Sequence, residues 1–233
     1  MPHKRVFSLV ILLCATAATA LATPIYTGEL LWDQTESQLH AGADWANTAT
    51  KIAWTVEKLG PGLWSYTYEL TVYHKDISHL IIETSDSINT LADVTSSVDL
   101  QQYDGNSYKF DVYSSTAQGN SNPNMPDAMY GVKFDLAGES TTITISFQRS
   151  NRDPVWGDFY AKDGKTDGVD NYVYNAGFTA NDQDPDPDVY GPDSLLVTDH
   201  ILVPDTTFVE PEPATLALLC AGAGMVLARR RGR

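Results

Sequence analysis

The sequence predicts an all-β domain, an antiparallel β-sandwich of jelly-roll type. Between the two chain ends, apolar residues recur with a period of two, as in half-buried strands. These runs are short and are separated by clusters of Gly, Asn, Asp and Pro, as at 104–106, 119–126 and 163–165. No stretch of the middle of the chain has a sustained helical period. Many short strands with turns between them are typical of sandwiches.

The clearest strand covers 63–74. Its large apolar residues alternate with polar ones and are expected to face inward: Trp64, Tyr66, Tyr68, Leu70 and Val72. The run 51–59 and the turn Gly60-Pro61-Gly62 precede it, which predicts a hairpin. Further strands are expected at 79–84, 108–113, 130–136, 141–149, 155–160, 172–178 and 199–203. The segment 181–193 contains Pro185 and Pro187 and is expected to be a loop.

Charge is distributed very unevenly along the chain. Six of the 15 Lys and Arg residues lie in the terminal segments, whereas 29 of the 30 Asp and Glu residues lie between 23 and 210, which leaves this middle part with a formal charge of about −20. Such a surface repels nucleic acid and anionic membranes, so neither is an expected partner of the domain. Cys14 and Cys220 both lie in terminal segments, which excludes disulfides and thiolate metal sites from the middle domain.

The first 22 residues have the form of a secretion signal. A short basic start is followed by the apolar run Val6 to Leu13 and then by small residues. Ala20 and Ala22 occupy the small-x-small positions of a signal peptidase site, so we expect cleavage after Ala22. Residues 23–208 would then form the exported domain. The alternative is an uncleaved membrane anchor.

Residues 209–233 carry three elements in a fixed order. Pro211-Glu212-Pro213 comes first, an uncharged and mostly apolar run follows at 214–228, and the cluster Arg229, Arg230 and Arg231 stands near the end. A helix over this run would be about 22 Å long, which is short for a hydrocarbon core of about 30 Å, but flanking residues and local thinning can make up the difference. The arginines are expected to stay on the cytoplasmic side, which leaves the domain outside.

The tail resembles the PEP-CTERM sorting signal of Gram-negative bacteria. The resemblance implies that exosortase, a membrane-embedded cysteine protease or transpeptidase, recognises Pro211-Glu212-Pro213. It also implies a transient inner-membrane anchor at 214–228 and an association with exopolysaccharide and biofilm. Lys75 to His79 and Pro154 to Gly164 are similar to the middle domain of some PEP-CTERM proteins, and this similarity implies no activity. The alternative for the tail is an ordinary single-span anchor.

The domain contains no recognisable catalytic motif. Gly-x-Ser-x-Gly, His-Glu-x-x-His and phosphate-binding Gly loops do not occur in the sequence. The histidines of the domain are interpreted as surface or structural residues: His40, His74, His79 and His200. We therefore expect no enzymatic activity, and a secreted hydrolase is the least favoured alternative.

Two acidic stretches are candidate calcium sites, because Ca²⁺ binds six to eight oxygens. The stretch 163–168 resembles the start of an EF-hand loop, but Lys165 and Tyr174 stand where ligands should be. The stretch 182–188 has alternating carboxylates without a turn glycine. Solvated loops are the favoured interpretation and no cofactor is expected; the alternative is a structural Ca²⁺ with ligands among Asp163, Asp167, Asp182, Asp184, Asp186 and Asp188.

One further group could contact sugars. Trp156, Asp158 and Tyr160 combine aromatic rings that could stack on a sugar with a carboxylate that could bind its hydroxyls. Aromatic residues on strands more often pack in a core, which is the favoured interpretation. The prediction is thus an exported, non-enzymatic surface or matrix protein that is processed by signal peptidase and exosortase. A carbohydrate-binding module, with exopolysaccharide as its ligand, is the alternative.

Overall fold

The computed structural model describes residues 23–204 except for the short segments 36–37, 86–87 and 117–121. Four predicted features lie outside the described residues: the signal peptidase site at Ala20 and Ala22, the motif Pro211-Glu212-Pro213, the transmembrane helix at 214–228 and the arginine cluster at 229–231. Within the described part of the chain, no helix is both long enough and apolar enough to span a membrane.

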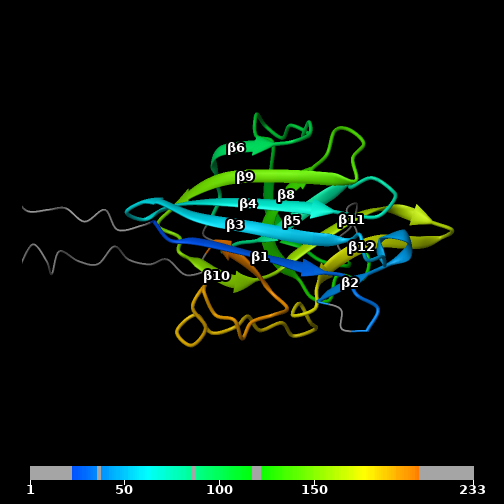
Figure 1. Cartoon of the computed structure of the whole chain (residues 1–233). Coiled ribbons are helices and arrows are strands. Elements are labelled where there is room, and N and C mark those ends of the chain that lie inside the picture. The colour runs from blue at the N-terminus through cyan, green and yellow to red at the C-terminus, as the bar shows by residue number, and fades with distance from the viewer. Residues whose placement is uncertain (1–22, 36–37, 86–87, 117–121, 205–233) are drawn as a thin grey trace, which may run out of the picture.

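Two antiparallel sheets and a small ribbon form the domain (Figure 1). The five-stranded sheet has the order β1 (Ile25–Leu31), β3 (Lys51–Gly60), β4 (Leu63–Thr71), β9 (Thr142–Ser150) and β6 (Ala92–Ser96). The six-stranded sheet has the order β2 (Leu39–Ala41), β12 (Val169–Asn175), β11 (Phe159–Thr166), β5 (His79–Glu83), β8 (Met129–Asp135) and β7 (Lys109–Tyr113). The ribbon pairs β10 (Pro154–Gly157) with β13 (Ile201–Pro204), and a 3-10 turn, η1, covers Ala43–Trp45.

The main core lies between the two sheets. The five alternating residues predicted to face inward from β4 and the residue after it are all buried, which confirms that prediction: Trp64, Tyr66, Tyr68, Leu70 and Val72. Phe147 from β9 and Phe134 from β8 stack across the two sheets with ring centroids 6.1 Å apart. Contacts of this kind between opposite sheets define a β-sandwich.

A second, smaller cluster lies on the other face of the six-stranded sheet. It consists of six buried residues: Ile81, Tyr113, Met125, Met129, Tyr160 and Phe178. The Tyr160 hydroxyl donates a hydrogen bond to the carbonyl oxygen of Pro123, 2.8 Å away. The segments after β7 and β12 therefore cover this face of the sheet.

Most of the predicted strands are present. The β3–β4 hairpin and its turn lie where they were predicted, and 181–193 contains no strand. The strands β1, β2 and β6 were not predicted. The turn predicted at 163–165 is wrong, because these residues belong to β11. The hairpin instead turns at Asp167 and Gly168, which both have positive φ, as a tight two-residue turn requires.

The predicted strand 155–160 is two strands. β10 ends at Gly157 and belongs to the ribbon, whereas β11 begins at Phe159 and belongs to the six-stranded sheet. Asp158 lies at the junction, where the chain leaves one sheet and enters another. A residue at such a junction is fixed by two sheets at once, and this one carries a buried carboxylate.

Candidate functional site

Four distant parts of the chain bring acidic and imidazole side chains together. Glu83 ends β5, Asp158 joins β10 to β11, Asp184 lies in the loop between β12 and β13, and His200 directly precedes β13. We call these four residues the carboxylate–histidine cluster. Asp158, Asp184 and His200 each offer one ligand atom, and these atoms all lie within 4.8 Å of one another. Asp158 is fully buried and His200 is 6% exposed.

Asp158 is held by hydrogen bonds at only one of its two carboxylate oxygens. The side-chain amide of Asn175 donates a hydrogen bond to Asp158 Oδ1 over 2.6 Å, and the same amide group donates to the Asp199 carbonyl oxygen at 2.9 Å. The Asp158 backbone N–H donates to Glu83 Oε2 at 2.9 Å. Among the described residues, Asp158 Oδ2 is buried and has no hydrogen-bond donor when the neighbouring carboxyl groups are ionised. A side-chain hydrogen bond with Asp182, which needs a proton on one of the two carboxyl groups, contributes to the raised pKa of Asp158. A buried carboxylate oxygen without a donor is costly, so this one is a candidate ligand atom.

His200 is oriented toward Asp158 by its neighbour. Its Nδ1 lies 2.9 Å from Asp199 Oδ1, and because a carboxylate only accepts, Nδ1 carries the proton. Its Nε2 lies 3.9 Å from Asp158 Oδ1, too far for a hydrogen bond. Within residues 23–204 as described, this Nε2 is buried and has no partner. The imidazole is thus fixed with one nitrogen directed to the cluster.

Two glycines make the room that the cluster needs. A Cβ atom on Gly177 would clash with the imidazole of His200. A Cβ atom on Gly157 would lie 2.7 Å from Glu83 Oε2 and 2.6 Å from Val203 Cγ2. Side chains larger than hydrogen at either position would push His200 or Glu83 out of place, so both glycines shape the site.

Burial and nearby negative charge raise the pKa values of the carboxyl groups of Glu83, Asp158 and Asp184. Burial, followed by repulsion from Asp184, raises the pKa of Glu83 to about 8. Burial raises the pKa of Asp184 to about 7, with a further contribution from the charge of Asp182. Burial and then the charge of Glu83 raise the pKa of Asp158 well above its usual range. The Asp158 backbone N–H lowers the pKa of Glu83, and the Asn175 amide lowers that of Asp158, but neither hydrogen bond outweighs burial.

The six carboxylates predicted as calcium candidates do not come together. Asp184 belongs to the cluster, and Asp182 lies close enough to raise the pKa of Asp158. Asp186 accepts a hydrogen bond from the backbone N–H of Asp188 at 2.9 Å and so stabilises its own loop. Asp163 lies in β11, and Asp167 lies in the exposed turn after it. The sequence interpretation missed Glu83 and His200 as members of the site, and it weighed Asp158 only for sugar binding.

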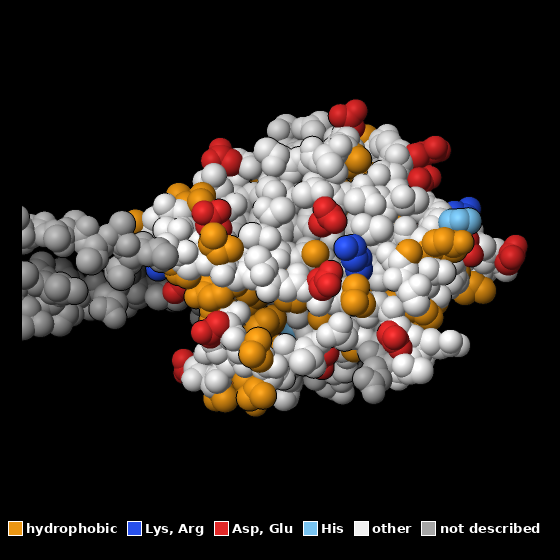
Figure 2. Space-filling view, viewed as in Figure 1, with side chains coloured by type: hydrophobic (Ala, Val, Ile, Leu, Met, Phe, Trp, Pro, Cys, Tyr) orange, Lys and Arg blue, Asp and Glu red, His pale blue; other side chains and the backbone are white. Residues whose placement is uncertain are grey.

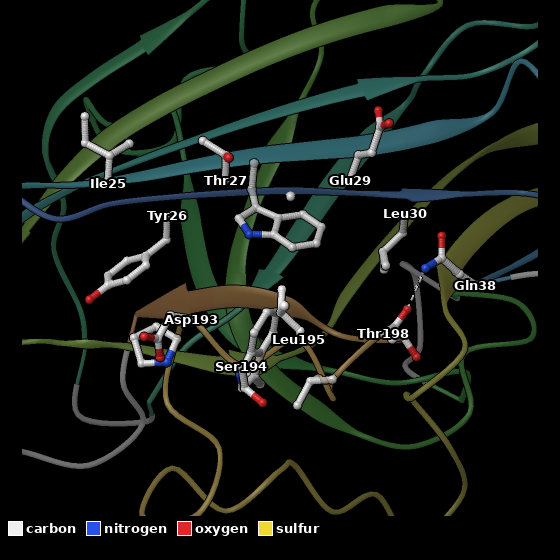
Figure 3. Close-up of a pocket in the computed structure, with 15 residues that line it drawn as sticks. Ile25, Tyr26, Thr27, Glu29, Leu30, Gln38, Asp193, Ser194, Leu195 and Thr198 are labelled. Carbon is white, nitrogen blue, oxygen red and sulfur yellow. Dashed lines mark hydrogen bonds between the residues drawn. The ribbon is translucent and has the colours of Figure 1, made fainter.

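A second candidate site is the groove between β1 and the loop before β13 (Figure 3). Its volume is about 440 Å³. Tyr26 and Leu30 of β1 point toward the loop that carries Asp193, Ser194 and Leu195, whereas the alternate residues of β1 point away (Figure 3). The Gln38 side-chain amide closes one end by donating a hydrogen bond to the Thr198 carbonyl oxygen at 2.8 Å.

Buried indole rings form the floor of this groove. A Cβ atom on Gly28 would clash with the Trp54 ring, so the glycine lets that ring pack beneath β1. Trp54 contacts Trp156 edge to face, with centroids 6.3 Å apart. Hydrophobic side chains gather around this part of the surface in Figure 2, and several large ones are exposed: Ile25, Leu31, Val189, Leu195 and Leu196.

The three residues considered for sugar stacking are buried. Trp156 is 6% exposed, and its indole N–H donates to the Gly191 carbonyl oxygen at 3.0 Å. Asp158 and Tyr160 are fully buried and belong to the cluster and to the smaller core, respectively. They therefore lie as the core interpretation expects, and of the three only Trp156 lines the groove.

Comparisons with known proteins leave the function open. No protein-family model matches the chain, and no curated protein matches it significantly. A solved structure described as "pH-induced modulation of Streptococcus parasanguinis adhesion by Fap1 fimbriae" is similar over 70% of this chain and 100% of that chain, with 14% sequence identity. Its TM-score of 0.31 is too low to carry an argument about either fold or function.

Proposed function

We propose that this protein is an exported, non-enzymatic surface or extracellular-matrix protein, which exosortase releases from a transient inner-membrane anchor into an exopolysaccharide-rich matrix. One observation carries the proposal. A basic start and an apolar run with the pattern of a secretion signal lie within residues 1–22, and Pro211-Glu212-Pro213, an apolar run and an arginine cluster lie in that order within 209–233.

The arrangement of the domain ends supports this proposal. Ile25, at the start of β1, pairs with Glu57 close to the β3–β4 turn. Pro204, at the end of β13, pairs with Pro154, the first residue of β10. β10 follows shortly after Ser150, the last residue of β9, and Ser150 pairs with Leu63 beside the β3–β4 turn. The described domain therefore begins and ends at one end of the sandwich, as Figure 1 shows for β1 and for the orange C-terminal strand. A domain of this shape can stand away from a membrane to which its C-terminal side is tethered.

The topology of the two sheets is consistent with the jelly-roll type that the sequence predicted. The chain passes repeatedly between the two sheets, at β1–β2, β2–β3, β4–β5, β5–β6, β6–β7 and β8–β9, and we assign it to the jelly-roll type on this basis. The acidic surface, visible as scattered red side chains in Figure 2, favours solubility outside the cell. The Asp158 carboxylate is buried and Glu83 is only partly exposed, so both are poorly placed to reach a glycan, which argues against the hydrolase alternative.

Replacing Pro211, Glu212 and Pro213 together by Ala is expected to leave the protein in the inner membrane. Proline holds the backbone extended, the form in which proteases commonly bind substrate chains, and Ala would let the apolar helix continue through the motif. Cell fractionation in a host that carries exosortase measures the outcome: wild type in the surface or medium fraction, and the variant in the membrane fraction. Equal release of the two proteins would contradict the proposal.

Carbohydrate binding is the second candidate, and the groove favours it. Tyr26 presents a half-buried ring beside the polar side chains of Gln38, Asp193 and Ser194, a mixture that suits a sugar. We expect the released protein to co-sediment with exopolysaccharide of its host and Asp193→Ala to weaken this binding about tenfold. Asp99→Ala, in a smaller pocket that β6 helps to line, is the control. Equal binding by both variants would exclude the groove.

A further inference from the structure

We propose that the carboxylate–histidine cluster binds one divalent transition-metal ion, with Zn²⁺ as the best match, through His200 Nε2 and the carboxylates of Asp158 and Asp184. This site goes beyond the proposed export and sorting, and it does not depend on them. The bound ion would connect Asp184, in the acidic loop between β12 and β13, with Asp158, at the junction of the ribbon and the six-stranded sheet.

Two unpartnered buried atoms point to a bound ion. Asp158 Oδ2 and His200 Nε2 are both buried and, among the described residues, both lack a hydrogen-bond partner when the neighbouring carboxyl groups are ionised. An acidic cluster on its own would be satisfied by water, but Asp158 is fully buried and His200 is 6% exposed. A cation between them would give each atom the partner that it lacks.

The orientation of His200 is that of a metal ligand. A histidine that binds a metal through one nitrogen usually donates its other N–H to a carboxylate or a carbonyl, which fixes the tautomer. His200 does so through Nδ1 and Asp199 Oδ1, 2.9 Å apart. The lone pair of Nε2 is thereby directed toward Asp158. Asn175 plays the corresponding part for Asp158, since it donates to Oδ1 and leaves Oδ2 for the ion.

The dimensions and donor types favour zinc over calcium. Ligands that are each about 2.1 Å from a tetrahedral ion lie about 3.4 Å apart. His200 Nε2 lies 3.9 Å from Asp158 Oδ1, the neighbour of the oxygen that would bind the ion. Since the three ligand atoms lie within 4.8 Å of one another, ion binding requires them to approach one another by up to about 1.4 Å. Imidazole is a poor ligand for Ca²⁺ but a common one for Zn²⁺, and carboxylates complete many zinc sites.

The burial of the cluster indicates a structural role for the ion. Catalytic zinc sites keep one position open to water or substrate, whereas Asp158 and His200 are buried and Asp184 is partly buried. The Pro154-to-Gly164 segment, singled out in the sequence, thereby gains a physical reason for its Gly-Asp pair. Gly157 admits the Glu83 carboxylate, and Asp158 supplies a ligand.

The test uses the full-length protein, purified in mild detergent and stripped of metal with EDTA. Titration calorimetry is expected to show one Zn²⁺ bound per chain. Thermal unfolding is expected to occur about 5–10 °C higher when free Zn²⁺ exceeds its Kd a hundredfold. Ca²⁺ at the same concentration is expected to shift the melting temperature by less than about 2 °C.

Single substitutions inside and outside the cluster test which side chains bind the Zn²⁺ ion. His200→Ala and Asp184→Asn should each weaken Zn²⁺ binding at least tenfold. Asp186→Asn in the same loop and His74→Ala on the surface should leave the affinity unchanged. If His200→Ala does not fold, Asp184→Asn decides, because this residue lies in a loop. The proposal is overturned by an absence of stoichiometric Zn²⁺ binding, by tighter binding of Ca²⁺, or by equal affinities of Asp184→Asn and Asp186→Asn.

Discussion

Phe147→Ala is expected to lower the free energy of unfolding by about 3–5 kcal/mol, the usual cost of removing a buried aromatic ring. Phe147 is fully buried in the middle of β9. Its ring stacks on Tyr66 of the neighbouring strand at 5.6 Å and on Phe134 of the opposite sheet at 6.1 Å. The substitution leaves a cavity that borders both sheets, and these cannot close on it without losing their other contacts.

Urea unfolding of the wild type and the variant measures this loss. Gln148→Ala is the control, because Gln148 is the next residue on β9, is only partly buried and points to the other face. Its cost should stay below about 1 kcal/mol, as for most surface substitutions. A loss below about 1 kcal/mol for Phe147→Ala as well would mean that the ring does not connect the two sheets.

The contribution of His79 to stability is expected to fall in acid, beginning below about pH 6.5. Glu83 and Asp184, with pKa values raised to about 8 and about 7, act in the opposite direction, so the effect of His79 is measured as the difference between the wild type and His79→Gln. His79 is buried at the start of β5. Burial, followed by the charges of Lys133 and Lys162, holds its pKa well below the usual range, and the hydrogen bond from Nε2 to Asn122 only partly opposes this effect. Asp135 lies 3.8 Å from the His79 Nδ1 atom, but it pairs more closely with Lys133 Nζ, at 3.0 Å.

The direction of the effect follows from proton binding. Below pH 6.5 the unfolded chain takes up a proton at His79 and the folded chain does not, so acid favours unfolding by up to about 1.4 kcal/mol per pH unit. Above pH 6.5 both states are neutral and the contribution is constant. His79→Gln should remove this slope while it keeps a donor for Asn122. The test is to measure the unfolding free energies of the wild type and of His79→Gln at pH 7.0, 6.0 and 5.5. If the two proteins depend on pH in the same way, His79 takes up its proton in the folded protein as readily as in the unfolded chain, which contradicts the prediction.

Much of the sandwich could be predicted because many of its strands and turns are determined by residues close together in the sequence. The β3–β4 hairpin has a clean period of two and a Gly-Pro-Gly turn, and both were found where the pattern placed them. The strand β1 was missed because Gly28 interrupts its pattern, and the glycine is there to admit the Trp54 ring, which comes from a different strand. The break at Asp158 was missed because the change from one sheet to another leaves no mark in the local alternation of residues.

The candidate site could be predicted only in part because its residues are far apart in sequence. Glu83, Asp158, Asp184 and His200 share no spacing motif, and only the fold brings them together. The acidic loop drew attention to Asp184 by composition alone. Two short sequence patterns coincide with Asp158 and His200: the Gly-Asp pair at 157–158 and the Asp-His pair at 199–200. Neither is specific without a structure, because surface histidines beside aspartates are common.

The most direct test of the proposed export and sorting is the intact mass of the protein recovered from the surface or the medium of a host that carries exosortase. The account predicts a chain that begins at Thr23 and lacks the residues after the Pro211-Glu212-Pro213 region, so that Arg229 to Arg233 are absent. The same measurement on the variant with three alanines should show an intact tail, in the membrane fraction only. A released wild-type protein that still carries Arg233 would contradict the account.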